Sequence, residues 1–301
     1  MSASPFASFL PATVAHLTEA DSIRTAHSIV RQAISIPLSP QPVETAYVRQ
    51  GSRGPALLLL HGFDSSVLEF RHLLPLLTRH HRVWAVDLLG FGFTDRAGGL
   101  PAGPPAIRVH LYHFWQSVIS EPVLLVGASM GGATAIDFAL AHPEAVEKLV
   151  LIDSVGYTNA PPILKFLTPP LDYLAVEWWR QRKVQALALG TVLGGWVPAM
   201  VEQVRCAALH LEMPRWHEAM IAFNRSGGYG EMEEHIRRLD KQTLILWGDS
   251  DDVLSRDDAR KFRLAIRDSR LIWIKNCGHA PQIEQPEITA QHILAFGRWR
   301  P

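Results

Sequence analysis

The feature that most constrains this chain is a serine in a turn between a predicted strand and a predicted helix. Ser129 lies at the centre of Gly127-Ala128-Ser129-Met130-Gly131. The apolar run 122–126 before it is typical of a buried strand, and the alanine-rich segment 133–140 after it is typical of a helix. Two glycines permit the sharp turn that lifts a serine hydroxyl out at the carboxyl end of a strand. The sequence therefore predicts an α/β fold that carries a nucleophilic serine.

A serine hydroxyl is a weak nucleophile at neutral pH, so it needs a base and an acid that orients the base. The predicted buried strand 243–248 runs into a loop with three aspartates, and the predicted strand 270–274 runs into a loop that contains His279. Since the serine also follows a strand, all three side chains would meet at one edge of a parallel sheet. The order Ser, Asp, His predicts a catalytic triad that includes Ser129 and His279.

Four further segments carry recognisable motifs: His61-Gly62-Phe63, the run Asp87-Leu88-Leu89-Gly90-Phe91-Gly92-Phe93-Thr94-Asp95, W-G-x-x-D at 247–251 and G-H-x-P-x-x-E-x-P at 278–286. With the serine turn, they resemble the motifs of the α/β-hydrolase family from about residue 43 to the C-terminus. The resemblance implies a mostly parallel, eight-stranded sheet flanked by helices, with a helical lid inserted. Segment 61–95 is also similar to a poorly characterised branch found in cyanobacteria and plants, which implies no settled substrate.

The resemblance also implies roles for single residues. Among the three aspartates of the loop, the family spacing selects Asp251 as the acid, while Asp153, after the predicted strand 148–152, stays open as a second candidate. The backbone N–H groups of Phe63 and Met130 would form the oxyanion hole. We expect His61 to make structural hydrogen bonds rather than to act as a second base.

Asp64 is an unusual neighbour for an oxyanion hole. If its carboxylate pointed into the site, its charge would oppose the developing anion. We therefore expect Asp64 to make a local hydrogen bond, or to cap a helix together with Ser65 and Ser66.

The chain divides into three predicted parts. Residues 1–42 form an N-terminal extension, mostly helical over 9–35, and residues 43–154 with 240–301 form the α/β-hydrolase core. The stretch 155–239 is far longer than a strand-to-helix crossover needs, which predicts a helical lid. The lid is rich in aromatic and aliphatic residues, and Trp178, Trp179 and Trp196 are its candidate substrate contacts. We expect a substrate with a hydrophobic acyl or alcohol part.

Composition excludes several other classes of protein. The chain has 29 Lys plus Arg and 29 Asp plus Glu, so no basic or acidic field favours nucleic acid or an anionic membrane as a partner. The N-terminus lacks the pattern of a signal peptide, and the uncharged stretch 184–201 contains glycines and a proline that argue against a membrane span. Two distant cysteines suggest neither a disulfide framework nor a zinc site. We expect a cytoplasmic enzyme that requires no metal or organic cofactor.

The hypothesis from sequence is a serine hydrolase that cleaves a carboxylic ester through an acyl-enzyme. Relatives of this fold that attack alkyl groups carry aspartate where this chain carries Ser129, so acyl chemistry is expected. Three alternatives stay open: a C–C bond hydrolase acting on a β-diketone-like substrate, an acyltransferase or cofactor-free perhydrolase, and a non-catalytic receptor for a small ligand. The plant and cyanobacterial resemblance adds pigment or lipid esters, such as phytyl esters, as a candidate substrate class.

Overall fold

The fold is built around one sheet of eight strands, in the order β1-β2-β4-β3-β5-β6-β7-β8. The computed structural model describes residues 6–96, 98–158, 165–193 and 198–298. Strand β2 runs antiparallel to both of its neighbours, and the pairs from β4 to β8 are parallel. The mostly parallel, eight-stranded sheet expected from the sequence is therefore confirmed. Its strands are β1 (Ile29–Ile34), β2 (Val43–Gln50), β3 (Ala56–Leu60), β4 (Arg82–Val86), β5 (Val123–Ala128), β6 (Val146–Ile152), β7 (Thr243–Gly248) and β8 (Ser269–Ile274).

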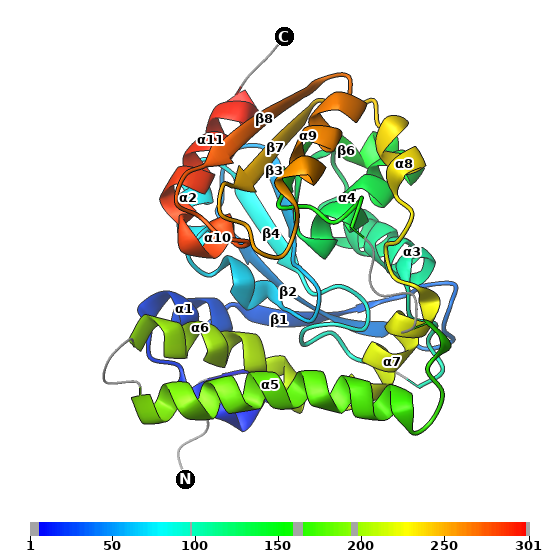
Figure 1. Cartoon of the computed structure of the whole chain (residues 1–301), viewed down its shortest axis with the longest axis vertical. Coiled ribbons are helices and arrows are strands. Elements are labelled where there is room, and N and C mark those ends of the chain that lie inside the picture. Colours follow the sequence, from blue (N-terminus) through cyan, green and yellow to red (C-terminus); the bar gives the residue numbers. More distant parts are fainter. Residues whose placement is uncertain (1–5, 97, 159–164, 194–197, 299–301) are drawn as a thin grey trace.

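Helices cover both faces of this sheet, which explains the uninterrupted apolar runs of its central strands. In β3 every residue is buried: Leu58 and Leu60 pack in the core on one face, and Leu57 and Leu59 pack in the core on the other. Helices α3, α4 and α9 cover the first face, and α1, α2 and α11 cover the second (Figure 1). The α-helices are α1 (Ala20–His27), α2 (Leu74–Leu77), α3 (Pro104–Phe114), α4 (Met130–Ala141), α5 (Leu171–Leu193), α6 (Pro198–Ala208), α7 (Trp216–Ser226), α8 (Glu233–Arg237), α9 (Arg256–Ala265), α10 (Pro281–Glu284) and α11 (Pro286–Arg298).

The segment between β6 and β7 carries helices α5 to α8, and we call it the lid. In Figure 1, α5 and α6 run side by side along one end of the molecule, and α7 lies against α5. Shorter helical turns complete the fold: the 3₁₀ helices η1 (Ala12–His16), η2 (Val67–Phe70), η4 (Pro143–Ala145) and η6 (Leu209–Glu212), and the π turn η3 (Trp115–Ile119). Within the described residues, none of the helices combines the length and the hydropathy needed to cross a bilayer.

The prediction of a mostly helical segment over 9–35 is wrong at its end. After η1 and α1 the chain forms β1, which pairs with β2 from Ile29 opposite Val48 to Ile34 opposite Val43. The apolar spacing that suggested one continuous helix spans the end of α1 and the start of β1. The β-branched Ile29 and Ile34 are buried against the sheet, where such side chains pack well. The extension 1–42 thus supplies an edge strand as well as helices.

Candidate active site

Ser129 lies in a strained turn between β5 and α4. Its backbone has φ 52° and ψ −118°, a conformation that residues other than glycine rarely adopt. The turn leaves no room for side chains on either side, because a Cβ on Gly127 would lie 2.2 Å from the carbonyl oxygen of Gly131. A Cβ on Gly131 would lie 2.1 Å from the carbonyl oxygen of Leu60 in β3. The two glycines therefore permit the close approach of strand and helix that presents the hydroxyl.

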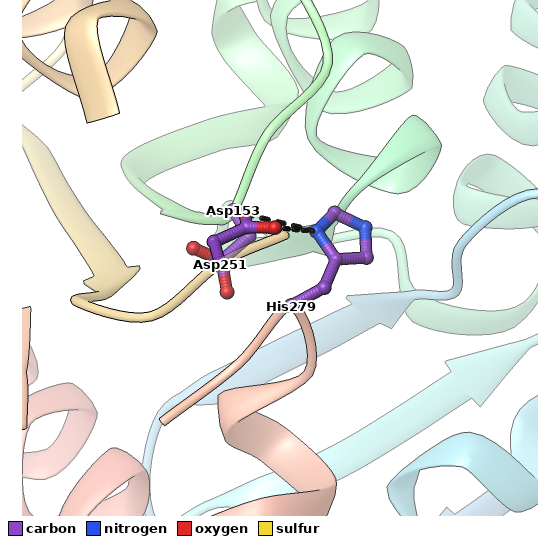
Figure 2. Close-up of side chains that lie close together, drawn as sticks. All are labelled: Asp153, Asp251 and His279. Carbon is purple, nitrogen blue, oxygen red and sulfur yellow. Dashed lines mark hydrogen bonds and ion pairs between the residues drawn. The ribbon is translucent and has the colours of Figure 1, made fainter. Parts of the chain in front are cut away.

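The structure brings Ser129, His279 and Asp251 together from three separate loops. The Oγ of Ser129 lies 3.1 Å from Nε2 of His279, and Nδ1 of His279 lies 3.0 Å and 3.2 Å from the two oxygens of Asp251. Figure 2 shows the hydrogen bonds between His279 and Asp251. This geometry lets the imidazole receive a proton from the hydroxyl while the carboxylate holds its other nitrogen.

The loop after β7 keeps the Asp251 carboxyl group ionised. Its Oδ1 accepts hydrogen bonds from the backbone N–H groups of Val253 at 2.8 Å and Leu254 at 3.0 Å. Burial alone would raise the pKa of Asp251, but the hydrogen bonds from His279 and from these two N–H groups lower it below its ordinary value. Asp251 is thus a carboxylate at neutral pH, as an orienting acid must be.

Asp153, the second candidate acid, lies beside the same imidazole but binds elsewhere (Figure 2). It is fully buried at the end of β6, and its Oδ1 accepts from the backbone N–H of Gly248 at 2.9 Å. Burial, reinforced by the neighbouring charge of Asp251, raises the pKa of Asp153 to about 9. Its carboxyl group is therefore protonated at neutral pH, unlike that of Asp251.

Among the described residues, Asp153, Asp251 and His279 also form a group whose metal-ligating atoms lie within 4.8 Å of one another. A cation bound there would need Nδ1 of His279 and a carboxylate oxygen of Asp251. Both atoms are already used in the hydrogen bonds that orient the imidazole. Metal binding and the orientation of His279 are thus mutually exclusive.

The residues that carry the proposed oxyanion donors, Phe63 and Met130, lie close to Ser129. Met130 is the first residue of α4, so its N–H belongs to the first helical turn, where backbone donors have no partner within the helix. Phe63 follows Gly62, on which a Cβ would lie 3.4 Å from Cβ of Ser129. Phe63 and Met130 also line one common pocket. This placement suits two N–H groups that share one oxyanion.

Two buried groups hold the backbone that leads to Phe63. The His61 ring lies 2.8 Å by Nδ1 from the carbonyl oxygen of Gly62, and its Nε2 accepts from the N–H of Leu88 at 3.1 Å. Burial lowers the pKa of His61 to about 4, so the ring is neutral and structural, as expected. Glu69, which sequence reasoning missed, accepts from the N–H of Gly62 at 3.0 Å. An acidic residue inside the apolar run 67–70 was the available signal.

Asp64 binds residues of the lid and not the neighbouring residues that were expected from the sequence. Its carboxylate accepts hydrogen bonds from the lid: His210 at 2.8 Å, Trp216 at 2.9 Å, Trp179 at 3.1 Å and Lys183 at 2.6 Å. These partners are 115 to 152 positions away in the chain, so local sequence could not indicate them. Although burial would raise the pKa of Asp64, the contacts with His210 and Lys183 hold it well below its ordinary range.

The helix that follows Asp64 begins without its help. Ser66 is the N-cap of η2, and its Oγ accepts from the N–H of Leu68 at 3.4 Å. The prediction that Asp64 makes a local hydrogen bond or caps this helix is therefore wrong, because the lid supplies its donors instead.

A mostly apolar pocket of about 640 Å³ lies between the core and the lid. Trp178 and Trp179 of α5 line it, and Trp196 lies outside the described residues. Contact of these side chains with a substrate stays a prediction. Every side chain that lines the described pocket is uncharged: Phe63, Met130, Val155, Thr158, Ala175, Val176, Trp178, Trp179, Trp216, Met220, Phe223, Asn224, Tyr229, Val253 and Leu254. The pocket thus suits a neutral, hydrophobic ligand.

Comparisons with known proteins agree with this architecture. The sequence model described as "Alpha/beta hydrolase family" matches residues 57–292. The alpha/beta hydrolase domain-containing protein VTE7 of Arabidopsis thaliana is 32% identical over 97% of this chain and 90% of its own length.

Two bacterial relatives have more specific names. The 2-hydroxy-6-oxo-6-(2'-aminophenyl)hexa-2,4-dienoic acid hydrolase of Metapseudomonas resinovorans is 33% identical over 84% of this chain and 87% of its own length. Lipase 1 of Psychrobacter immobilis is 27% identical over 83% of this chain and 79% of its own length. These relatives are hydrolases by name, and their named substrates differ.

Proposed function

This chain belongs to the alpha/beta hydrolase family, and from that premise we propose that it is a serine hydrolase of carboxylic esters with a hydrophobic acyl or alcohol part. The observation that carries the proposal is the hydrogen-bonded chain from Ser129 through His279 to Asp251, next to an uncharged apolar pocket. The lipase among the relatives supports ester chemistry.

In the proposed reaction, Oγ of Ser129 attacks the ester carbonyl while Nε2 of His279 takes its proton. The Asp251 carboxylate keeps the imidazole in the correct orientation and stabilises its positive charge. The N–H groups of Phe63 and Met130 hold the oxyanion of the tetrahedral intermediate. His279 then gives the proton to the leaving alcohol, and a water molecule activated by His279 releases the acyl group as a carboxylic acid.

The test is a screen of ester and thioester substrates with the wild-type protein beside Ser129→Ala, together with labelling by a fluorophosphonate probe. We expect the wild type to hydrolyse esters and to be phosphonylated on Ser129, and the variant to lose both properties. Undiminished hydrolysis by Ser129→Ala would show that another group is the nucleophile. Product analysis with added methanol separates the two kinds of enzyme: a hydrolase releases the carboxylic acid, whereas an acyltransferase forms the methyl ester.

A second candidate is C–C bond hydrolysis, because the relative from Metapseudomonas resinovorans is named for a dienoic acid. Such an acid carries a carboxylate, which binds best beside a positive charge. The described pocket lining supplies no Arg or Lys side chain, so its chemistry favours a neutral ester. Direct assay of that dienoic acid beside a neutral ester of similar size would decide between them.

A further inference from the structure

We propose that Asp64 is a positioning residue that links the oxyanion-binding peptide of Phe63 to the lid. On this view, full stabilisation of the transition state requires the lid to lie where the structure has it. The inference rests on the proposed function, because it gives Asp64 its effect through the Phe63 N–H. It is carried by the contacts of residues 62–64 and by the burial of the Asp64 carboxylate.

Three different lid segments converge on this one carboxylate. The donors come from α5, through Trp179 Nε1 and Lys183 Nζ, from η6, through His210 Nε2, and from α7, through Trp216 Nε1. Lys183 also donates to the backbone carbonyl oxygen of Asp64 at 2.6 Å. The backbone of Asp64 has φ 47°, a left-handed conformation that is uncommon outside glycine, although aspartate adopts it more readily than most residues. Lid contacts therefore hold both the side chain and the main chain of this residue.

Burial makes these contacts strong and specific. The side chain of Asp64 is 1% exposed, and a carboxylate without water is costly unless its oxygens accept hydrogen bonds. Burial also lowers the pKa of His210, whose Nε2 lies 2.8 Å from Oδ1 of Asp64. The ammonium of Lys183 lies 2.6 Å from the carboxylate and supplies a positive charge that balances Asp64. A lid displaced from this position would remove all four of these side-chain donors from the Asp64 carboxylate.

The peptide between these anchors carries the proposed oxyanion donor. On one side, the Gly62 N–H donates to Glu69. On the other, Asp64 is bound to the lid. The Phe63 ring itself packs on Phe223 of the lid, with ring centroids 5.5 Å apart. The carbonyl oxygen of the same peptide, that of Gly62, lies 2.8 Å from Nδ1 of His61. We infer that the Asp64 contacts fix the other end of residue 63 and so complete the direction of its N–H. Oxyanion donors stabilise a transition state only when they are aimed correctly.

Asp172 provides a matched control. Like Asp64 it is a nearly buried carboxylate, with 8% of its side chain exposed, but it belongs to the lid and binds Arg225 at 2.6 Å. This pair joins α5 to α7 within the lid and lies outside the contacts of residues 62–64. Asp172→Asn therefore removes one nearly buried ion pair inside the lid and leaves every contact of residues 62–64 in place.

The experiment compares Asp64→Asn and Asp172→Asn in the full-length protein. It measures Tm, kcat and KM with p-nitrophenyl butyrate, and the inhibition constants of an alkyl trifluoromethyl ketone and of the matched alcohol. The ketone forms an oxyanion with Ser129, whereas the alcohol does not. We expect Asp64→Asn to lower kcat by about 10- to 100-fold and to raise the inhibition constant of the ketone by a similar factor. The reason is that an oxyanion donor that points in the wrong direction loses most of its effect. KM and the inhibition constant of the alcohol should stay within about 3-fold of their wild-type values.

Asp172→Asn should leave the ratio of ketone to alcohol affinity unchanged. The inference is overturned if Asp64→Asn lowers Tm but keeps kcat and this ratio, or if it alters KM alone. If Asp64→Asn does not fold, Lys183→Met removes the charge that holds the Asp64 carboxylate and carbonyl, and it should shift the same ratio. A wild type that reacts with neither the fluorophosphonate nor the ketone overturns the proposed function, and this inference with it.

Discussion

Asp153 and Asp251 place two carboxyl groups beside one imidazole, and they are in opposite protonation states. Asp251 is hydrogen-bonded to Nδ1 of His279, while Asp153 accepts from the N–H of Gly248. Hydrogen bonds lower the pKa of Asp251, and burial raises that of Asp153 to about 9. The negative charge beside His279 therefore resides on Asp251, and this difference can be measured.

Amide substitutions should separate the two carboxyl groups by their effects on rate. We expect Asp251→Asn to lower kcat by roughly 10³- to 10⁴-fold, because an amide can stabilise the wrong tautomer of His279. Asp153→Asn should stay within about 5-fold of wild type, since an amide closely resembles a protonated carboxyl group. Steady-state kinetics with p-nitrophenyl butyrate checks both values. Equal losses in the two variants would mean that Asp153 shares the role of the acid.

The same substitution should change how stability depends on pH. Between pH 4 and pH 9 the unfolded chain has released the Asp153 proton that the folded protein retains, because the folded pKa is about 9. The contribution of Asp153 to the free energy of unfolding is therefore fully present below pH 4. It declines as the pH rises toward 9, by at most about 1.4 kcal/mol per pH unit. Asp153→Asn removes this decline, so its stability relative to wild type should increase from pH 5 to pH 9.

Urea unfolding at pH 5, 7 and 9 measures this change in the free energy of unfolding. Asp252→Asn, an exposed change in the loop that carries Asp251, is the control and should run parallel to wild type. A constant difference between Asp153→Asn and wild type across this range would contradict a protonated Asp153.

The central strands of the sheet could be predicted from their apolar sequence alone. The strands 56–60, 82–86 and 243–248 were predictable because nearly all of their residues are buried between two layers of helices. Strand β1 was not, because its apolar residues continue the helical spacing of α1, and only pairing with β2 decides its conformation. Local pattern therefore fails where a long-range contact selects between two structures.

In the candidate site, too, some residues could be found from sequence motifs and others could not. Ser129 and His279 lie in motifs whose spacing indicates their chemistry, and the structure places them within hydrogen-bond distance. Their catalytic roles stay predictions until the variants are measured. The lid contacts of Asp64 and the Gly62 contact of Glu69 depend on three-dimensional packing. No spacing of residues in the sequence indicates them.

Cys277 should not react although it lies two residues before His279. Its side chain is buried, and burial raises the pKa of the thiol to about 12. At pH 8 roughly one molecule in 10⁴ would carry the reactive thiolate. We expect iodoacetamide to leave the ester hydrolysis of the native protein unchanged, and mass spectrometry to show alkylation of Cys277 only after unfolding. Rapid labelling with loss of activity would contradict this burial.

The apolar pocket should select esters by the length of their acyl chain. Each methylene that leaves water contributes up to about 0.8 kcal/mol, which is about 4-fold in kcat/KM when the transition state retains the contact. We therefore expect p-nitrophenyl octanoate to exceed p-nitrophenyl acetate by at least about 100-fold. A preference for acetate would contradict a hydrophobic substrate.

A substitution inside the pocket should weaken this selection for long chains. Ala175 of α5 lines the pocket, and Ala188 of the same helix is exposed to solvent. Ala175→Trp fills space that a long chain would occupy, so kcat/KM for octanoate should fall by about 10-fold or more, while acetate stays within about 3-fold. Ala188→Trp adds the same indole to the same helix outside the pocket and should change neither substrate. If both variants affected octanoate equally, the acyl chain would bind elsewhere, because only one of the two indoles enters the space between core and lid.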